Sequence, residues 1–308
     1  MTTITKHLLL GLFFALPFTG IAQKTVLQKE QLLQDIKILS ADSLEGRLSG
    51  TPGNKLAQEY IQKRFKQIGL QSYGDSYKQH FKLESKRVVV EQASNLVGYI
   101  LGKKEGFIVV TAHYDHVGVR EGEVYNGADD NASGVGGLLA AASYFKKHKP
   151  KHTILFVALD GEELGLQGAN AFLENTPVPK ERILLNVNMD MLSLNNKGEL
   201  YASGTYHYPF LRPYLEQVAP RPQAKLVLGH DLPEQGHDDW TGQSDHYQFH
   251  KRQIPFVYFG VEDHPHYHKP TDEYQNINAS FYPDAASLVI DFVQLADQNL
   301  EHSRQKKQ

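Results

Sequence analysis

The chain of 308 residues contains no cysteine, one tryptophan and three methionines. Without cysteine it can form no disulfide and can carry no lipid on a thiol, so its stability must come from a hydrophobic core. That excludes the small disulfide-stapled modules common among exported proteins. Its hydrophobic content of 41% and charged content of 22% are ordinary for a soluble globular protein.

The chain also lacks an excess of charge of either sign. Its formal net charge is -3, which gives no reason to expect nucleic acid or an anionic membrane as a partner. The sequence also contains no internal repeat and no low-complexity linker, and we interpret it as one domain.

The first 22 residues have the features of a secretory signal peptide. Lys6 lies in a short basic segment, and residues 8–18 are apolar but too few to cross a bilayer. Gly20 and Ala22 are small residues at the -3 and -1 positions of a signal-peptidase cleavage site. We expect cleavage after Ala22 and a mature domain of residues 23–308, located in the periplasm or outside the cell and free of the membrane. The alternative is an uncleaved N-terminal anchor.

Hydrophobic periodicity predicts an α/β fold. Apolar residues at helical spacing predict helices over 28–39, 55–69, 134–148, 165–175 and 281–299, and short apolar runs predict strands over 77–83, 95–101, 107–112, 153–159, 182–189 and 254–260. Strands and helices alternate between residues 107 and 190, which indicates a mixed, mostly parallel central sheet with helices on both faces, a three-layer sandwich. For residues 221–250 the sequence predicts a long polar loop region with one short strand over 225–229.

Potential metal ligands follow the predicted strands. In open α/β sheets, functional sites form at the carboxyl ends of the strands, so residues far apart in sequence can meet there. Two histidines and three carboxylates suit a borderline divalent ion such as zinc. The five candidates are His113, Asp129, Glu163, Asp190 and His268.

Two acidic residues beside these candidates have complementary roles. Glu162, next to Glu163, could act as the base that a metal-dependent hydrolase needs. Asp115 stands two residues after His113 and could orient its imidazole. A carboxylate has enough lone pairs to bridge two ions, so Asp129 could take this role.

Each motif also has a plain structural interpretation. The GADDNASG segment could be a turn with a helix N-cap, and the Glu162–Glu163 pair could be a negative first helical turn. Spacing does not decide between His268 and its neighbours His264 and His266. Asp190 is the most informative single position, because a carboxylate at the end of an apolar strand is costly unless it is paired or metal-bound.

Six short segments resemble, in the same order, those of the secreted dizinc aminopeptidase family of metallopeptidases. They are AHYDHVG, NGADDNASGV, ALDGEELGLQGA, NVNMDM, SDHYQF and YHKPTDEY, and the segment before them, residues 39–70, looks like the lead-in of many secreted members. Relatives of this family include glutamate carboxypeptidase II, glutaminyl cyclase and the transferrin-receptor ectodomain. The resemblance covers most of residues 36–295.

The resemblance implies a zinc exopeptidase fold and two zinc ions. One ion would be held by His113, Asp129 and Asp190, and the other by Asp129, Glu163 and His268. It further implies that Glu162 is the general base, that Asp115 orients His113, and that the Asp129–Asp130 peptide is cis. It also puts SDHYQF and the nearby tryptophan on the substrate side, and adjacency to the ligands adds two more residues. These substrate-binding candidates are Met191, Trp240, Ser244, Asp245, His246 and Tyr267.

The function that follows is hydrolysis of the N-terminal peptide bond of peptides. One alternative is a glutaminyl cyclase, but those enzymes typically use one zinc ion and lack the histidine that His113 supplies here. A second is a non-catalytic binding module, which the filled ligand positions disfavour. A glutamate-type carboxypeptidase would need a cationic pocket, for which Arg212, Arg221 and Arg252 are candidates.

Overall fold

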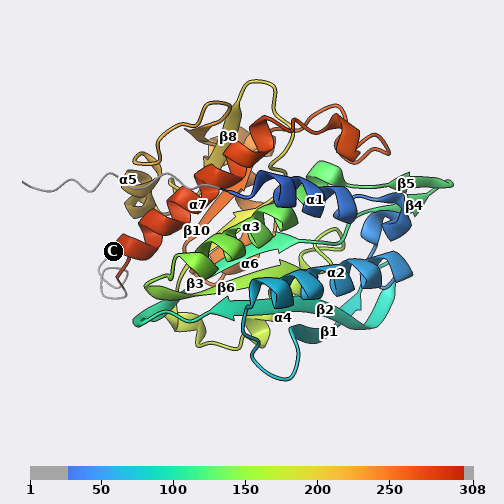
Figure 1. Ribbon diagram of the computed structural model, residues 1–308, viewed down its shortest axis with the longest axis horizontal. Helices are drawn as coiled ribbons and strands as arrows, with labels where there is room; N and C mark the ends of the chain where they lie inside the picture. The colour runs from blue at the N-terminus through green and yellow to red at the C-terminus, as the bar shows by residue number, and fades with distance from the viewer. Residues whose placement is uncertain (1–26, 302–308) are drawn as a thin grey trace, which may run out of the picture.

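The computed structural model describes residues 27–301, so the signal-peptide prediction for residues 1–22 lies outside the described part. An eight-stranded mixed sheet crosses the domain in the order β1-β2-β6-β3-β7-β10-β8-β9 (Figure 1). The strands are β1 (Lys78–Glu84), β2 (Val89–Ile100), β3 (Lys104–His113), β6 (His152–Leu159), β7 (Ile183–Met189), β8 (Glu199–Ser203), β9 (Lys225–Leu228) and β10 (Phe256–Gly260). Strands β6, β3, β7 and β10 form a parallel centre, which confirms the predicted α/β class.

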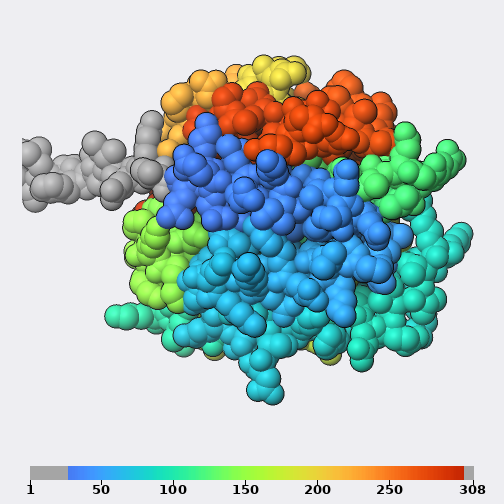
Figure 2. Space-filling model, turned by 45° about the vertical axis from the view of Figure 1, so that its right-hand side comes forward, coloured from blue at the N-terminus to red at the C-terminus, as the bar shows by residue number. Residues whose placement is uncertain are grey.

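Helices cover both faces of this sheet. On one face lie α1 (Lys29–Leu39), α2 (Pro52–Ile68), α3 (Gly134–Lys147) and α7 (Phe281–Asn299), and on the other lie α4 (Gln167–Glu174) and α6 (His246–His250). In Figure 2 the blue N-terminal segment with α1 and α2 lies beside the red C-terminal segment with α7. The three-layer prediction is therefore confirmed. None of the helices within residues 27–301 has the length and hydropathy needed to span a bilayer.

The central strands are buried on both faces, as their continuous apolar sequences predict. In β6 the side chains of Ile154 and Phe156 join the large core under α1, α2, α3 and α7, whereas Leu155 and Val157 join a second core with α4 and α6. This alternation follows the two-residue period of a strand.

Helix α2 begins three residues before its predicted start. The Thr51 side chain accepts a hydrogen bond from the backbone N–H of Asn54, and Pro52 occupies the first turn. The helix ends at Gly69, which has a φ of 79° and takes the left-handed C-terminal position that glycine favours.

Three short strands were not predicted from the sequence. Strand β8 pairs antiparallel with β10 and parallel with β9 at the edge of the sheet. Strands β4 (Gly118–Arg120) and β5 (Glu123–Tyr125) form a two-stranded hairpin inside a segment expected to be loop. Strands of three to five residues are too short to show a periodic signal.

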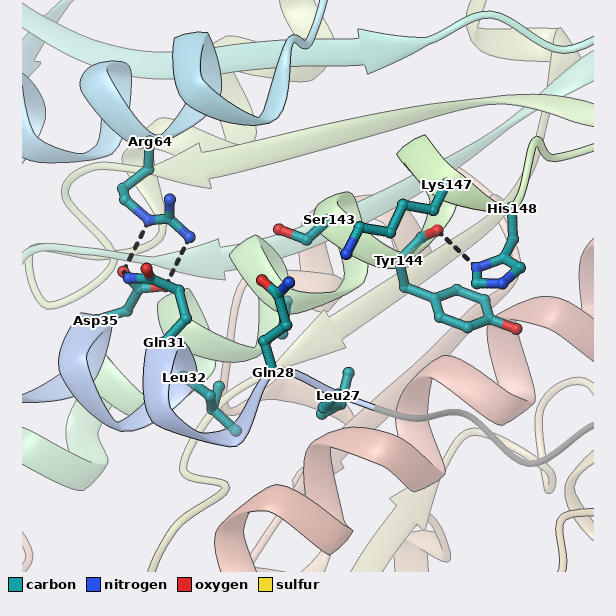
Figure 3. A pocket seen from close by; sticks show the side chains of 11 residues that line it. Leu27, Gln28, Gln31, Leu32, Asp35, Arg64, Ser143, Tyr144, Lys147 and His148 are labelled. Carbon is teal, nitrogen blue, oxygen red and sulfur yellow. Dashed lines mark hydrogen bonds and ion pairs between the residues drawn. The ribbon is translucent and has the colours of Figure 1, made fainter.

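A buried ion pair joins the two N-terminal helices. Asp35 of α1 lies 2.8 Å from the Arg64 guanidinium of α2 and also accepts a hydrogen bond from the Tyr60 hydroxyl. The pair lies beside a small cavity of about 40 Å³ between α1, α2 and α3 (Figure 3). Since both charges are mostly shielded from water, the pair fixes how these helices meet.

A second buried arginine ties the lead-in segment to the ends of the sheet. Arg47, 1% exposed, donates hydrogen bonds to the backbone carbonyls of Leu39, Tyr114, Asn126 and Gly127. Tyr114 directly follows β3, and Gly127 precedes α3 by a few residues. Arg47 therefore holds together two loops that emerge at the same edge of the sheet.

We expect Arg47→Met to lower the free energy of unfolding by about 4 kcal/mol or more, because each of the four carbonyls left without a donor costs about 1–3 kcal/mol. Urea unfolding followed by circular dichroism measures the loss. Arg87→Met, at an exposed arginine, is the matched control and should change stability by less than about 0.5 kcal/mol. Equal effects of the two substitutions would show that the Arg47 contacts are dispensable.

Candidate metal centre

The carboxyl ends of the parallel strands deliver most of the candidate residues to one place. His113 is the last residue of β3, Asp190 directly follows β7, and Glu163 lies in the loop between β6 and α4. His268 lies in the segment after β10, and the residues before α3 complete the group. The structure thus brings together four of the five predicted ligands.

Two overlapping clusters of potential donor atoms lie at this edge. One comprises His113, Asp130 and Asp190, and the other comprises His116, Asp130, Glu163 and His268. Nε2 of His113 is 3.2 Å from Oδ1 of Asp190 and 3.4 Å from Oδ1 of Asp130. Nε2 of His268 is 3.0 Å from the other oxygen of Asp130 and 3.3 Å from Oε1 of Glu163. Asp130 therefore presents one oxygen to each cluster.

The prediction that Asp129 joins the two clusters is wrong, because its neighbour Asp130 occupies that position. The Asp129 carboxylate points away: Oδ1 accepts hydrogen bonds from Ser133 and from the backbone and hydroxyl of Ser193, and Oδ2 lies 3.0 Å from Nε2 of His264. The cis peptide likewise lies at Asp130–Asn131 and not at Asp129–Asp130. Because Asp129 and Asp130 are adjacent in the same segment, the sequence does not indicate which of them lies between the two clusters.

His268, and neither His264 nor His266, belongs to the cluster. His264 contacts Asp129, and Nδ1 of His266 lies 3.0 Å from the Thr271 hydroxyl. The His268 ring stacks on Tyr267 at 4.1 Å, which holds the imidazole in place even though His268 is exposed.

His116, which was not predicted as a site residue, is fully buried beside Glu163 and Asp130. It is the second histidine of the AHYDHVG segment, three residues after His113. Two histidines three residues apart are a recognisable pattern for metal ligands. His116 was not predicted because His113 alone accounted for a metal ligand in this segment.

Asp115 positions the neighbouring acidic pair. Its two carboxylate oxygens accept hydrogen bonds from the backbone N–H groups of Glu162 and Glu163. Its own carbonyl oxygen lies 3.2 Å from Nδ1 of His113, whereas its carboxylate lies 3.8 Å from that nitrogen. Asp115 thus contacts His113 through its backbone and fixes the Glu162–Glu163 loop through its side chain. Helix α4 begins only at Gln167, so the glutamate pair is not a first helical turn.

The crowded charges shift the acidities of these groups. Burial raises the pKa of Glu162; the His113 charge opposes this, and Asp190 and Asp245 add to it. Burial also disfavours charge on Asp190, but the nearby His113 lowers the Asp190 pKa overall. Burial alone would lower the pKa of His113, yet Asp190 and Glu162 raise it. Of Glu162 and Asp190, which both line the cleft, only Glu162 has a raised pKa, and a raised pKa suits a carboxyl that has to carry a proton.

The clusters open into a cleft of about 240 Å³. Met191, Trp240 and Tyr267, predicted to contact substrate, all line it. Gln243, Tyr258, Val261 and Asp263 also line it and were not predicted. Gln243 and Asp263 lie in polar loops where the sequence offers no pattern to separate a cleft residue from an ordinary surface residue.

Ser244, Asp245 and His246 do not line the cleft, contrary to expectation. They are fully buried at the start of α6, where Ser244 accepts a hydrogen bond from the Asn188 amide and Nε2 of His246 lies 3.0 Å from the Trp240 carbonyl. Burial and the charge of Asp190 raise the pKa of Asp245 to about 7, against the opposing charge of His113. These residues support the wall of the site and do not reach its interior.

The donor set fits zinc. Two atoms that each lie about 2.0 Å from one ion in a tetrahedral arrangement are roughly 3.3 Å apart, close to the 3.0–3.4 Å separations that involve His113 and His268. Oε1 of Glu163 and both ring nitrogens of His116 are buried without a hydrogen-bond partner of acceptable geometry. Buried polar atoms are rarely left so unless a ligand completes them.

An α/β sandwich with paired histidine–carboxylate clusters at its strand ends and a glutamate beside them is the arrangement of metal-dependent hydrolases. Residues 95–293 match peptidase family M28. The chain belongs to this family.

Two curated relatives are bacterial. The chain is 30% identical over 166 residues to the alkaline phosphatase isozyme conversion protein of Escherichia coli, covering 49% of this chain and 48% of that protein. It is 28% identical over 224 residues to aminopeptidase YwaD of Bacillus subtilis, covering 67% of this chain and 45% of that protein. The chain therefore spans about half the length of these relatives.

Solved structures share the fold at lower identity. A zinc aminopeptidase from Bacillus subtilis aligns with a TM-score of 0.70 and 18% identity over 91% of this chain and 98% of that chain. A glutaminyl cyclase from Bacteroides thetaiotaomicron aligns with a TM-score of 0.70 and 16% identity over 88% of this chain and 99% of that chain.

The geometry separates the roles of the two adjacent aspartates. We expect Asp130→Asn to lose most zinc binding, because Asp130 presents an oxygen to each cluster. Asp129→Asn should keep the metal but lose stability, since its carboxylate holds Ser193 and His264. Elemental analysis after dialysis against zinc measures the metal content of both variants, and urea unfolding measures their stability. Normal zinc content in Asp130→Asn would contradict the assignment.

Proposed function

We propose that the protein is a zinc-dependent aminopeptidase that hydrolyses the N-terminal peptide bond of peptides. Two zinc ions would be held, one by His113, Asp130 and Asp190, and one by the cluster of Asp130, Glu163 and His268, with Asp130 shared. When bound, the ions would polarise the substrate carbonyl and increase the acidity of water.

Glu162 is the proton carrier in this proposal. It lines the cleft next to both clusters, and Asp115 holds its backbone. Burial raises its pKa, as a group that must take up a proton requires. Glu162 would accept a proton from the attacking water and pass it to the departing amine, and the fixed loop would keep it within reach of both.

The acidic lining of the cleft is the observation that favours an aminopeptidase. Among its described lining residues there is no lysine or arginine, whereas Glu162, Glu163, Asp190 and Asp263 contribute carboxylates. Such a lining attracts the ammonium group at the start of a peptide and repels the carboxylate at its end. Met191, Trp240, Tyr258 and Tyr267 provide apolar surface for the first side chain.

The three arginines considered for a carboxypeptidase lie elsewhere. Arg212 pairs with Glu216, Arg221 pairs with Asp291, and Arg252 donates to Asn170 and Gln248. None of them lines the cleft, which argues against recognition of a substrate carboxylate.

Glutaminyl cyclase activity is the second candidate, because a cyclase shares this fold. Two assays distinguish the aminopeptidase from the cyclase. The first measures turnover of aminoacyl chromogenic substrates, with N-acetylated substrates as controls. The second measures the reaction of a peptide with an N-terminal glutamine. Chelator-sensitive release that requires a free amine supports the aminopeptidase. Cyclisation of the glutamine peptide without release would establish the cyclase.

We expect Glu162→Gln to lower kcat by about 10²–10⁴-fold, the usual contribution of a general acid–base group, with zinc content unchanged. Glu174→Gln, at an exposed glutamate of α4, is the control and should keep full activity. Near-normal turnover in Glu162→Gln would refute its role.

We also propose that residues 1–22 form a signal peptide and that the mature protein is exported. The prediction is that protein recovered from the periplasm or the medium starts at Gln23, as N-terminal sequencing or intact mass would show. Recovery of uncleaved chain from the membrane fraction would favour the anchor.

A further inference from the structure

His116 lies at the metal centre without a role in the mechanism described above. It follows β3, is fully buried, and belongs to the cluster with Asp130, Glu163 and His268. The backbone is shaped around its ring: a Cβ on Gly127 would stand 2.5 Å from Cδ2 of His116, so only glycine fits there, and Gly127 has a φ of 55°.

The ring nitrogen that faces the cluster approaches two carboxylates. Nδ1 of His116 is 2.7 Å from Oε1 of Glu163 and 3.7 Å from Oδ2 of Asp130. Yet neither His116 nitrogen, nor Oε1 of Glu163, makes a hydrogen bond of acceptable geometry. Donor atoms that are close but do not point at one another are arranged as ligands around a common centre.

We propose that His116 is a fourth protein ligand of one zinc ion, together with Asp130, Glu163 and His268. This inference rests on the proposed presence of zinc, but not on the reaction. It makes the two metal positions unequal. One has four protein donors, the number that closed zinc sites carry, and the other has three, which leaves a position open.

The open position lies beside the proton carrier. All three donors of this cluster, His113, Asp130 and Asp190, line the cleft with Glu162, whereas His116 of the other cluster does not. Because it has one more protein ligand, the four-donor ion would be the more tightly held and the three-donor ion the more exchangeable.

The direct test uses the unaltered protein. Crystals of the zinc-loaded chain, measured at the zinc absorption edge, should show an anomalous peak about 2.0–2.2 Å from Nδ1 of His116. A peak near Glu163 and His268 but more than 3 Å from that nitrogen would overturn the proposal and leave His116 as an ion-pair partner of Glu163. No peak at this cluster would overturn it as well.

A variant measures the energetic consequence. His116→Gln keeps the size of the side chain, and zinc affinity of its four-donor position should fall about 100-fold or more, since even partners outside the ligand set affect affinity 10–100-fold. Competition with a chromogenic chelator resolves the two binding steps, and only the tighter should weaken. His152→Gln, at a buried histidine that contacts Asp297, is the matched control and should leave both steps unchanged.

Equal effects of the two substitutions on zinc affinity would overturn the inference. The proposed function is tested separately. If the protein bound two zinc ions but released no amino acid from peptides with a free amine, the proposed function would be wrong and the His116 inference would stand. Circular dichroism of the metal-free variants distinguishes loss of a ligand from loss of the fold.

Discussion

The structure depends on bringing several carboxylates together in a small, mostly buried volume. Asp115, Asp130, Asp190 and Asp245 are buried at one edge of the sheet, and the half-buried Glu162 lines the cleft beside them. Buried carboxylates repel each other and lose hydration, so they are costly unless positive charge compensates them. His113, His116 and His268 lie among these carboxylates as further potential donor atoms, and divalent cations held by both kinds of ligand would supply this compensation.

A surrounding layer of hydrogen bonds holds this group in place. The Asp272 carboxylate accepts hydrogen bonds from the backbone N–H groups of Asp129 and Asp130. The Asp115 carboxylate accepts hydrogen bonds from those of Glu162 and Glu163. Arg47 donates hydrogen bonds to the carbonyls of Tyr114, next to His113, and of Gly127, three residues before Asp130. These contacts fix the backbone and leave the functional side chains free to face the centre. Rigid placement of this kind gives a site its affinity and its reactivity.

Site residues that lie directly at strand ends can be predicted from the sequence. Where two adjacent residues are equally good candidates, the sequence does not show which one faces the site. His113 and Asp190 could be located because each follows an apolar strand whose end is plain in the sequence. Asp129 and Asp130 could not be distinguished, since both follow the same turn and only the backbone shows which carboxylate faces inward. The burial of Ser244 and Asp245 was equally hidden, because it depends on how α6 packs beneath the cleft and not on any local pattern.

The cleft and the clusters together suggest how one acidic surface serves two purposes. Glu163 and Asp190 face the clusters, where cations would neutralise them, whereas Glu162 and Asp263 also line the cleft and are absent from both clusters. Charge left over after metal binding would therefore concentrate toward the cleft, on the side that a substrate enters. In the proposed aminopeptidase, a peptide that approached with its ammonium group first would gain attraction there, and its first carbonyl would then lie toward the ions and Glu162. The same surplus of negative charge that makes the site costly to fold would thereby select which end of a peptide is cleaved.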